Sequence, residues 1–369
     1  MSSPSYDLPP THGGQLRQLT ARYGIPTERL IDFSANINPA GPPSSVMAAI
    51  RHSLGEPSTL ANYPDLELAE LKQTIANRMK VDPDNIAVAN GFVPLLDAAL
   101  RSLKIARCLL PVPCFGEYRR TLKNAGVVTT PYYLSHDGGF AYQIDAILRA
   151  LLDHSCDALL LANPQNPSGV LDIAGRMLRL IEIAAQHNVT VLLDEAFIDY
   201  CPSDSLTREA TRHANVVVFR SVTKFFAVPG LRVAYAVSES SHIFAINRLI
   251  APWPITTFAS NAICAALQDE IYAEETRVAN GCRRLWLEQE LARLKVPTYP
   301  SSANFLLLRF PAGLDINLLW ERMIVEELLV LRSCMNFEGL APGHLRIAVR
   351  SESENEKLIR GLGRILSTS

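Results

Sequence analysis

The chain has 369 residues, which is more than one hydrophobic core usually takes, so we expect two domains. Hydrophobic residues make up 48% and charged residues 20% of the chain, a composition that is ordinary for a soluble globular protein. The net charge of −2 gives no reason to expect nucleic acid or an anionic membrane as a partner. No apolar run approaches the ~20 residues of a membrane span.

The cysteines and the first residues indicate the compartment. The seven cysteines are scattered with no CxxC spacing, which favours a reducing, cytoplasmic environment and gives no metal site. The stretch from Met1 to Thr11 is polar and contains proline, and it lacks the charged-then-apolar pattern of a signal peptide. We therefore expect a cytoplasmic protein.

Residues 1–40 are predicted to form an N-terminal arm that belongs to the small domain. The arm contains His12-Gly13-Gly14, a short helix over 15–23, and a polar stretch that ends at Pro39. By itself, His12 is typical of an exposed histidine before a helix. Asn36 and Asn38 are typical of residues that form the turn at 39–41. Ser44 and Ser45 follow as candidate caps of a helix that runs to Leu54.

Apolar strands alternate with helices over residues 41–250. Alternation of this kind predicts a large α/β domain whose central sheet is mainly parallel and covered on both faces. The predicted strands span 86–89, 108–112, 157–162, 189–195, 215–219 and 233–237. The predicted helices span 66–79, 94–103, 115–124 and 177–187.

The pattern changes after Val237, where a short helix is predicted over 244–249, and a hinge is predicted at the break around Pro252 and Pro254. Residues 251–369 are predicted to form a small α+β domain. It starts with one long helix over 258–294 that contains a kink, and it ends with a helix over 354–366 for which Ser353 is the expected cap. Between them lie strands 304–309, 329–332 and 344–350 and a helix over 318–327.

Three polar residues fall at or just past the carboxyl ends of predicted parallel strands, where such sheets bind their ligands. They are Asn166, Asp194 and Lys224. Lys224 lies between two apolar runs, and desolvation there would favour a neutral amine that can condense with a carbonyl. Taken alone, such a lysine is most often a surface residue, and Asp194 could equally cap a helix. Their convergence favours a site.

Anion-binding groups accompany the lysine. Ser221, Thr223 and Arg232 offer hydroxyl groups and a guanidinium fork that suit a phosphate. A second candidate is the turn after strand 86–89, where the backbone N–H groups of Gly91, Phe92 and Val93 open a helix. Together these groups indicate a pyridoxal-phosphate site.

These motifs resemble those of the fold-type I pyridoxal-phosphate enzymes, the aspartate aminotransferase superfamily. Within it the chain is similar to the histidinol-phosphate aminotransferase branch, and most similar to the L-threonine-O-3-phosphate decarboxylases of cobalamin biosynthesis. The resemblance covers almost the whole chain. The motifs that carry it are HGG at 12–14, DFSANINP at 32–39, YPD at 63–65, NPQNPSG at 163–169, DEAFID at 194–199, SVTKFFAVPGLR at 221–232, RSC at 332–334 and RIAVR at 346–350.

The resemblance implies that pyridoxal 5′-phosphate is the cofactor and assigns roles around it. Lys224 would form the Schiff base with the cofactor aldehyde and move protons, and Asp194 would pair with the ring nitrogen. Asn166 would donate to the phenolic oxygen, where Phe197 lacks the hydroxyl of many relatives. Phe115 would stack on the ring, although a core aromatic fits it nearly as well.

The phosphate would be held from several sides. Its ligands would be Ser221, Thr223 and Arg232 of the same chain and Tyr63 of a second subunit, which implies a homodimer. After Gly91, relatives usually have small or polar residues, whereas Phe92 and Val93 offer only their backbone N–H groups and apolar side chains.

The substrate is expected to carry both a carboxylate and a phosphate. The implied substrate ligands are His12, Asn36, Arg332, Arg346 and Arg350, and a solvated charged face explains Arg350 equally well. The favoured activity is decarboxylation of L-threonine O-3-phosphate to (R)-1-aminopropan-2-yl phosphate. The alternatives are transamination of histidinol phosphate or a related amino acid, and a regulator that binds the cofactor without turnover.

Overall fold

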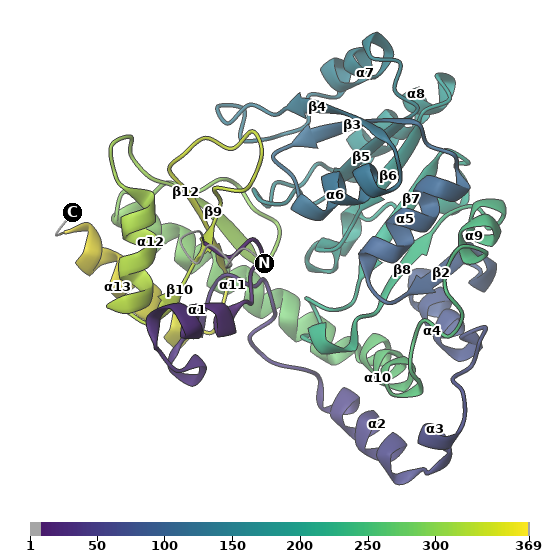
Figure 1. The fold of residues 1–369 in the computed structure, drawn as a ribbon, viewed down its shortest axis with the longest axis horizontal. Coiled ribbons are helices and arrows are strands. Elements are labelled where there is room, and N and C mark those ends of the chain that lie inside the picture. Colours follow the sequence, from purple (N-terminus) through teal and green to yellow (C-terminus); the bar gives the residue numbers. More distant parts are fainter. Residues whose placement is uncertain (1–8, 368–369) are drawn as a thin grey trace, which may run out of the picture.

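The computed structural model describes residues 9–367, so the first eight residues of the predicted arm, with part of the Met1 to Thr11 stretch, lie outside the described residues. A seven-stranded sheet with strand order β2-β8-β7-β6-β5-β3-β4 forms the larger part of the fold (Figure 1). Its strands are β2 (Ile86–Ala89), β3 (Arg107–Val112), β4 (Val128–Tyr133), β5 (Ala158–Ala162), β6 (Thr190–Asp194), β7 (Val216–Ser221) and β8 (Ala234–Val237).

Strands β3, β4, β5, β6 and β7 run parallel to one another. Strand β8 runs antiparallel to both of its neighbours, β7 and β2. The prediction of a mainly parallel sheet is therefore confirmed. Every residue of β5 and β7 is buried, as expected for strands covered on both faces. Strand β4 and the helix that follows it were not predicted, because Pro131 interrupts the strand pattern and half of its residues are polar or exposed.

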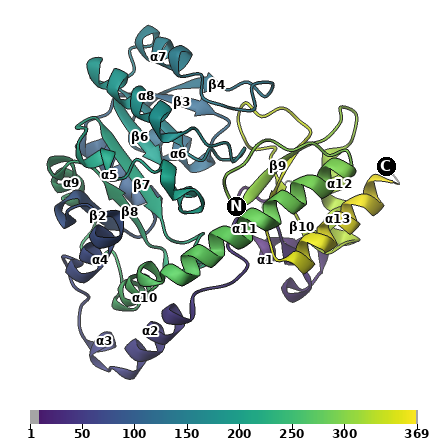
Figure 2. The same cartoon turned by 180° about the vertical axis from the view of Figure 1, so that it is seen from behind.

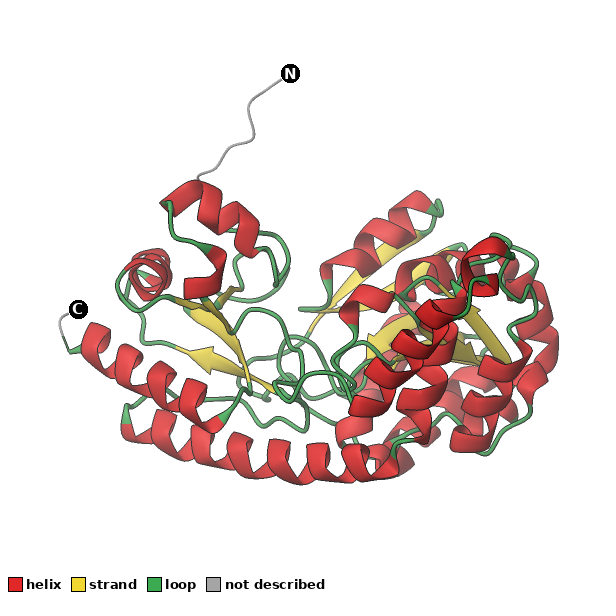
Figure 3. Cartoon of the chain, turned by 90° about the horizontal axis from the view of Figure 1, so that it is seen from below, coloured by secondary structure: helices red, strands yellow, loops and turns green. Residues whose placement is uncertain are grey.

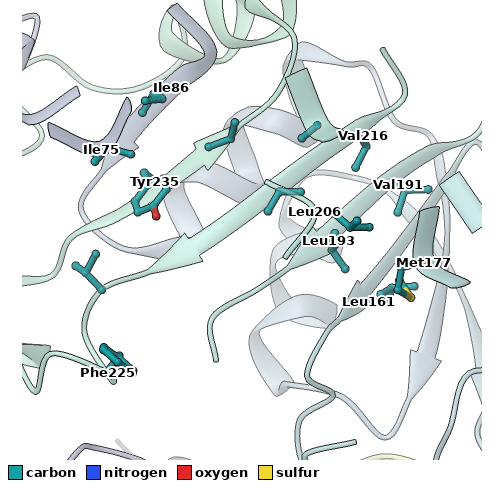
Figure 4. Close-up of a cluster of buried hydrophobic side chains, with 14 of the residues drawn as sticks. Ile75, Ile86, Leu161, Met177, Val191, Leu193, Leu206, Val216, Phe225 and Tyr235 are labelled. Atoms are coloured by element: carbon teal, nitrogen blue, oxygen red, sulfur yellow. The ribbon is translucent and has the colours of Figure 1, made fainter. Parts of the chain in front are cut away.

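Helices cover both faces of this sheet, and alternate strand residues face them (Figure 3). Leu161, Leu193 and Val216 point to one face, where they join a cluster with Phe225 and Tyr235 (Figure 4). That face is covered by α4 (Ala69–Met79), α7 (Ile144–Asp153), α8 (Ala174–Gln186) and α10 (Thr257–Gln268). The other is covered by α5 (Phe92–Ser102), α6 (Gly116–Asn124) and α9 (Ser240–Asn247).

The smaller part of the fold contains an antiparallel sheet in the order β11-β12-β9 and a parallel strand pair, β1 with β10. The strands are β1 (Ile31–Asp32), β9 (Phe305–Arg309), β10 (Leu329–Val330), β11 (Arg332–Ser333) and β12 (His344–Ala348). Three helices pack here with the C-terminal half of a fourth: α1 (Leu16–Tyr23), α12 (Ile316–Val325), α13 (Glu352–Leu366) and α11 (Glu270–Arg293). The predicted single strand over 329–332 is thus two short strands that pair with different neighbours.

The long helix expected over 258–294 is two helices. Asp269 separates α10 from α11, with ψ of 81°, and its side chain accepts a hydrogen bond from the N–H of Tyr272 as the N-cap of α11. Helix α11 then runs from the larger sheet to the smaller one (Figure 2). What looked like a kink in a continuous apolar pattern is a helix boundary.

Two predicted caps are wrong. Helix α13 is capped by Ser351, which forms a capping box with Glu354, and not by Ser353. Helix α2 (Ser44–Gly55) begins after Pro43 with no side-chain cap, so neither Ser44 nor Ser45 has that role. A short helix, α3 (Ser58–Ala61), follows α2. In the described part of the chain no helix is both long and apolar enough to cross a membrane. The division into segments 1–40, 41–250 and 251–369 stays a prediction.

Candidate functional site

A cavity of about 480 Å³ opens where the carboxyl ends of β5, β6 and β7 face the smaller part of the fold. Residues of the N-terminal arm close one side of it, and β11 and β12 contribute to another. Of the predicted site residues it is lined by His12, Asn36, Gly91, Phe92, Val93, Phe115, Asn166, Ser221, Thr223, Lys224, Arg232, Arg332 and Arg346. Asp194 lies beneath it, at the end of β6.

Lys224 lies on the loop after β7, and its Nζ donates a hydrogen bond to Ser221 Oγ at 2.9 Å. Burial lowers the pKa of the amine from its ordinary 10.5 to about 8; the positive charge of Arg232 acts in the same direction and Asp194 opposes it. A substantial neutral fraction is therefore present near neutral pH. A neutral amine is the form that can attack an aldehyde.

Asp194 is 6% exposed, and both of its carboxylate oxygens have partners. Oδ1 accepts from the N–H of Ala196 at 2.9 Å, and Oδ2 accepts a short hydrogen bond from the Tyr118 hydroxyl. Burial raises the pKa of Asp194, while the Tyr118 hydrogen bond and the charge of Lys224 counteract that rise. The carboxyl is thus oriented by α6 and by the loop after β6.

Tyr118 was missed in the sequence. It is 1% exposed and contacts the rings of Phe92 and Phe115, with centroids 5.6 Å away in both cases. Its hydroxyl is the polar end of an otherwise apolar residue. One feature of the sequence could have indicated this role: Tyr118 comes three residues after Phe115, in the first turn of the same predicted helix. Phe115 lines the cavity, whereas Tyr118 lies beneath it.

The candidate phosphate end lies where Arg232 meets the turn after β2. Gly91 has a φ of +91°, and a Cβ there would lie 2.7 Å from Arg232 Nη2, so only glycine leaves room for the guanidinium. Ser221 Oγ and Thr223 Oγ1 are 2.9 Å apart. Helix α5 begins at Phe92, so the first backbone N–H groups of a helix lie at this end of the cavity.

The apolar residues at this turn pack rather than leave a gap. The Phe92 ring lies edge-on to Phe219 at 5.3 Å. Val93 is 37% exposed, and Pro94 stands in the first turn of α5, where its missing N–H has no intrahelical partner to lose. The N–H of Gly91 donates to the Ala89 carbonyl at 2.7 Å, so of the three predicted backbone donors only those of Phe92 and Val93, in the first turn of α5, are left for a ligand. The side chains of this turn add no polar group.

Asn166 connects the two sides of the cavity. Its Oδ1 accepts from Arg346 Nη1 at 2.7 Å, which fixes the amide so that Nδ2 is the group left to donate. Phe197 lies on the same side, and Lys224 Nζ is 5.9 Å from its ring centre. Phe115 also lines the cavity, with its ring edge-on to Tyr118.

The two arginines from the smaller sheet are buried without an acidic partner. Arg332 and Arg346 are 5% and 7% exposed, and no carboxylate in residues 9–367 forms a salt bridge with either. They are direct cross-strand partners in β11 and β12. Burial, with the charge of Arg332 second, lowers the pKa of Arg346 to about 10, and burial lowers that of Arg332 too.

Neutral oxygens accept hydrogen bonds from both terminal nitrogens of each arginine, and for Arg332 they include the Pro10 and Ser333 carbonyls. Arg332 Nη2 donates to the Thr11 carbonyl at 2.6 Å and to Asn336 Oδ1 at 2.7 Å. Arg346 Nη2 donates to the Ser34 carbonyl at 3.2 Å, and its buried Nε has no hydrogen-bond partner among the described residues. Like charges placed opposite each other on neighbouring strands destabilise a sheet. The pair is therefore suited to anions that come from outside the chain.

The arm places two further predicted residues at the cavity. His12 Nε2 lies 3.1 Å from Glu117 Oε1, across the mouth between the arm and α6. The backbone oxygen of Asn36 accepts from Asn304 Nδ2 at 3.0 Å, and its buried Oδ1 has no hydrogen-bond partner in the described chain. Both side chains are thus at the end of the cavity that holds the arginines.

The structure does not bring Arg350 or Tyr63 into the cavity lining. Arg350 donates to the Asp32 carbonyl at 2.9 Å and forms a salt bridge with Glu354 at 2.7 Å. Tyr63 is 80% exposed and stacks on Trp253 with ring centroids 4.7 Å apart. Its expected contact with a neighbouring site involves a second subunit and stays a prediction.

The arrangement fits pyridoxal phosphate. One amine of lowered pKa, an amide donor and a cationic turn at a helix start line one cavity, and a buried carboxylate lies at the end of the neighbouring strand β6. Within residues 9–367 no group of three or more His, Cys, Asp or Glu side chains could hold a metal ion. The individual roles stay predictions.

Comparison with known proteins gives concordant results. The profile of the family described as aminotransferase class I and II matches residues 28–362. A threonine-phosphate decarboxylase from Salmonella typhimurium is 34% identical over 366 residues, which cover 96% of each chain.

Solved structures show the same fold. The histidinol-phosphate aminotransferase from Clostridium acetobutylicum aligns with a TM-score of 0.85 and 29% identity, over 92% of this chain and all of that one. An aspartate aminotransferase from Thermus thermophilus aligns with a TM-score of 0.81 and 22% identity, over 95% and 94% of the two chains. The predicted aspartate-aminotransferase-like α/β fold is therefore confirmed.

Proposed function

This chain belongs to the class I and II aminotransferase family, with pyridoxal 5′-phosphate as its cofactor, and from that premise we propose that it decarboxylates L-threonine O-3-phosphate. The product would be (R)-1-aminopropan-2-yl phosphate, an intermediate for cobalamin. The 34% identity to a threonine-phosphate decarboxylase over nearly the whole of both chains supports this choice.

The observation that carries the proposal is the buried, carboxylate-free pair Arg332 and Arg346. Each guanidinium is a bidentate donor for a carboxylate or a phosphate. L-Threonine O-3-phosphate has one group of each kind, so it neutralises both arginines in a single molecule. Histidinol phosphate has a phosphate but no carboxylate, and it would leave one buried cation without an anion.

The residues of the chain have separable tasks in this proposal. Lys224 would hold the cofactor covalently and move protons, Asp194 would keep the ring nitrogen protonated, and Asn166 would donate to the phenolic oxygen. When bound, pyridoxal phosphate supplies the electron sink into which the bonding electrons of the lost carboxylate flow. Arg332 and Arg346 would bind the carboxylate and the phosphate of the substrate and so would determine which bond of its Cα is aligned for cleavage.

The phosphate of the cofactor is assigned to the polar end of the cavity. Ser221, Thr223 and Arg232 would donate to it, together with the backbone N–H groups at the start of α5. Tyr63 of a second subunit would complete this shell. Because Tyr63 is 80% exposed beside Trp253, which is 44% exposed, the chain presents an aromatic pair that a homodimer would cover.

A second candidate is transamination. The likeness to a solved histidinol-phosphate aminotransferase at 29% identity supports it, and a dicarboxylate amino donor such as glutamate would also neutralise both arginines. The two reactions need the same cofactor site and differ in which Cα bond is aligned. The two reactions are therefore distinguished by their products, because both would use the same cavity.

The deciding experiment incubates the holoenzyme with L-threonine O-3-phosphate in the absence of any keto acid. The proposal expects stoichiometric carbon dioxide and aminopropanol phosphate. The control adds 2-oxoglutarate with either phosphorylated substrate and measures glutamate. Activity that requires 2-oxoglutarate would establish the transaminase and remove the decarboxylase.

A further inference from the structure

Asn38, at the end of the N-terminal arm, contacts the loop that carries Lys224. It is 5% exposed. Its backbone N–H donates to the Lys224 carbonyl at 3.1 Å, and its Nδ2 donates to the Phe225 carbonyl at 3.0 Å. The two bonds hold the carbonyl groups of the two successive peptide units that follow the Cα bearing the lysine side chain.

The same side chain is anchored to helix α11. Nδ2 lies 2.8 Å from the Tyr272 hydroxyl and 3.0 Å from Thr276 Oγ1, and Oδ1 accepts from the N–H of Ala40 at 3.1 Å. The Tyr272 hydroxyl in turn donates to the Gly41 carbonyl at 2.6 Å. The amide is thus held between the arm and α11, so its orientation does not depend on the lysine loop.

The lysine loop has few other backbone contacts of this kind. Within the loop, the Ala227 N–H reaches the Lys224 carbonyl at 3.3 Å, and Ala227 itself has a φ of +51°, a left-handed conformation that is strained for a residue with a Cβ. Elsewhere in the described chain, only Tyr272 Oη comes near the Phe225 carbonyl, at 3.5 Å. Asn38 is therefore the main polar support that the loop receives from outside.

We propose that Asn38 is a positioning residue for the Lys224 amine, because it clamps the two peptide units after Lys224 to the arm and to α11. The inference rests on the proposed function, in which Lys224 binds the cofactor. Reactive groups must be held to within a fraction of an ångström, and a shift of the backbone is passed on to the end of a flexible side chain. The turn-forming role expected for Asn38 accounts for its bond to Ala40 only.

Loss of the clamp has a consequence that can be measured on the amine itself. Its pKa of about 8 depends on burial, so a loosened loop that admits water moves it toward the ordinary 10.5. A rise of one unit lowers the neutral fraction about tenfold at pH 7. The charged and titratable groups that face the amine are Asp194 and Arg232, with His12, Glu117, Arg332 and Arg346 farther around the cavity and Tyr118 behind Asp194.

The test compares Asn38→Leu and Asn38→Ala with Thr276→Val. Leucine keeps the approximate volume and the backbone N–H of Asn38 and removes its side-chain amide, both the Nδ2 donor to Phe225 and the Oδ1 acceptor from Ala40. Valine removes one neighbour of the same amide and leaves the bond to the Phe225 carbonyl in place. In the cofactor-free protein, pulses of acetic anhydride across a pH series, followed by peptide mass spectrometry, give the pH midpoint of acetylation at Lys224.

We expect both Asn38 variants to raise the midpoint by about one pH unit and Thr276→Val to leave it unchanged. In the holoenzyme, kcat should fall while KM stays near the wild-type value, because Arg332 and Arg346 are untouched. A lowered melting temperature with a wild-type midpoint in both variants would show that Asn38 only stabilises the fold, and would overturn the proposal. Borohydride trapping of the cofactor at another lysine would instead refute the proposed function, and the acetylation midpoint would still decide the role of Asn38.

Discussion

The two ends of the cavity are built in different ways. Asn166, Asp194 and Ser221 follow neighbouring parallel strands of one sheet, in which Ala162 is aligned with Asp194, and Asp194 with Phe219. The other end takes its arginines from two antiparallel strands of a second sheet and its remaining groups from the N-terminal arm. One sheet therefore sets the cofactor end, whereas the substrate end combines a second sheet with the N-terminal arm, which lies far from that sheet in the sequence.

The electrostatic state of the two ends differs as well. At the cofactor end, Asp194 is satisfied by Tyr118 and Ala196, and Lys224 by Ser221. At the substrate end, Arg332 and Arg346 are opposed on neighbouring strands and have only neutral oxygens as partners. At the first end Asp194 and Lys224 thus have partners within the chain, whereas the two arginines of the second end are suited to an anionic ligand. Each prediction below tests one side of this contrast.

Lys224→Ala has the largest expected effect. Turnover should fall by about 10⁴-fold or more, because no other amine lines the cavity within residues 9–367, and loss of a covalent catalyst costs at least this much. Borohydride reduction followed by peptide mapping should find the cofactor on Lys224 of the wild type and on no lysine of the variant. Lys123→Ala, at an exposed position on α6, is the matched control and should keep both properties.

Arg346→Gln and Arg332→Gln test the other end. Each should lower kcat/KM about 100-fold, the effect of losing one partner of a buried charged pair once substrate is bound. Without cofactor or substrate, inorganic phosphate should raise the melting temperature of the wild type by mass action, and less so in either variant. An undiminished phosphate effect in both variants would show that the arginines are not anion ligands.

The difference between the two ends also explains which site residues could be predicted from the sequence. Asp194 and Lys224 were predictable without any relative, since buried strands end visibly at 194 and just before 224, and ligands bind at such ends. The prediction of Arg332 and Arg346 depended on the resemblance, because their pairing requires β11 and β12 to meet across the ten residues of loop between them. No local pattern reveals such a register.

The features that could not be predicted from the sequence all depend on tertiary contacts. Tyr118 and Asn38 act on site residues through long-range hydrogen bonds, and their local patterns are those of a helix and a turn. Helix boundaries were also uncertain, because an apolar pattern runs through Asp269 although the chain bends there. Contacts between residues far apart in the sequence determine the roles of Tyr118 and Asn38 and the helix boundary at Asp269, and a single sequence does not show such contacts.

Tyr118→Phe should have an intermediate effect, about a tenfold loss of kcat/KM, as expected for one hydrogen bond to a charged group. The phenol counteracts the burial-induced rise in the pKa of Asp194, so its removal raises that pKa further. Because the carboxylate is lost as the pH falls through this value, the acidic limb of the pH–rate profile should move to higher pH. Tyr142→Phe removes an equally buried hydroxyl, one bonded to the Ala162 carbonyl, and should leave the limb in place.

The lowered pKa of Lys224 should appear in the stability of the cofactor-free protein. Between pH 8 and 10 the unfolded chain binds more protons at this amine than the native one does, so the free energy of unfolding rises with pH. The contribution is about 1 kcal/mol per pH unit at most, and Lys224→Met should remove it. Denaturant unfolding of both proteins at pH 8, 9 and 10 measures the difference between their slopes. Parallel slopes would mean that the native amine titrates like a free one.

Arg350→Gln should have the smallest effect on catalysis and so marks the boundary of the substrate end. Arg350 is close in sequence to Arg346, but its guanidinium is occupied by Glu354 and the Asp32 carbonyl. We expect kcat/KM to stay within about twofold of the wild type, while the free energy of unfolding falls by about 1 kcal/mol through the lost pair and hydrogen bond. Steady-state kinetics with denaturant unfolding separates these effects. If KM rises as far as in Arg346→Gln, the anion site includes a third arginine. The substrate end would then not be limited to the two arginines of β11 and β12.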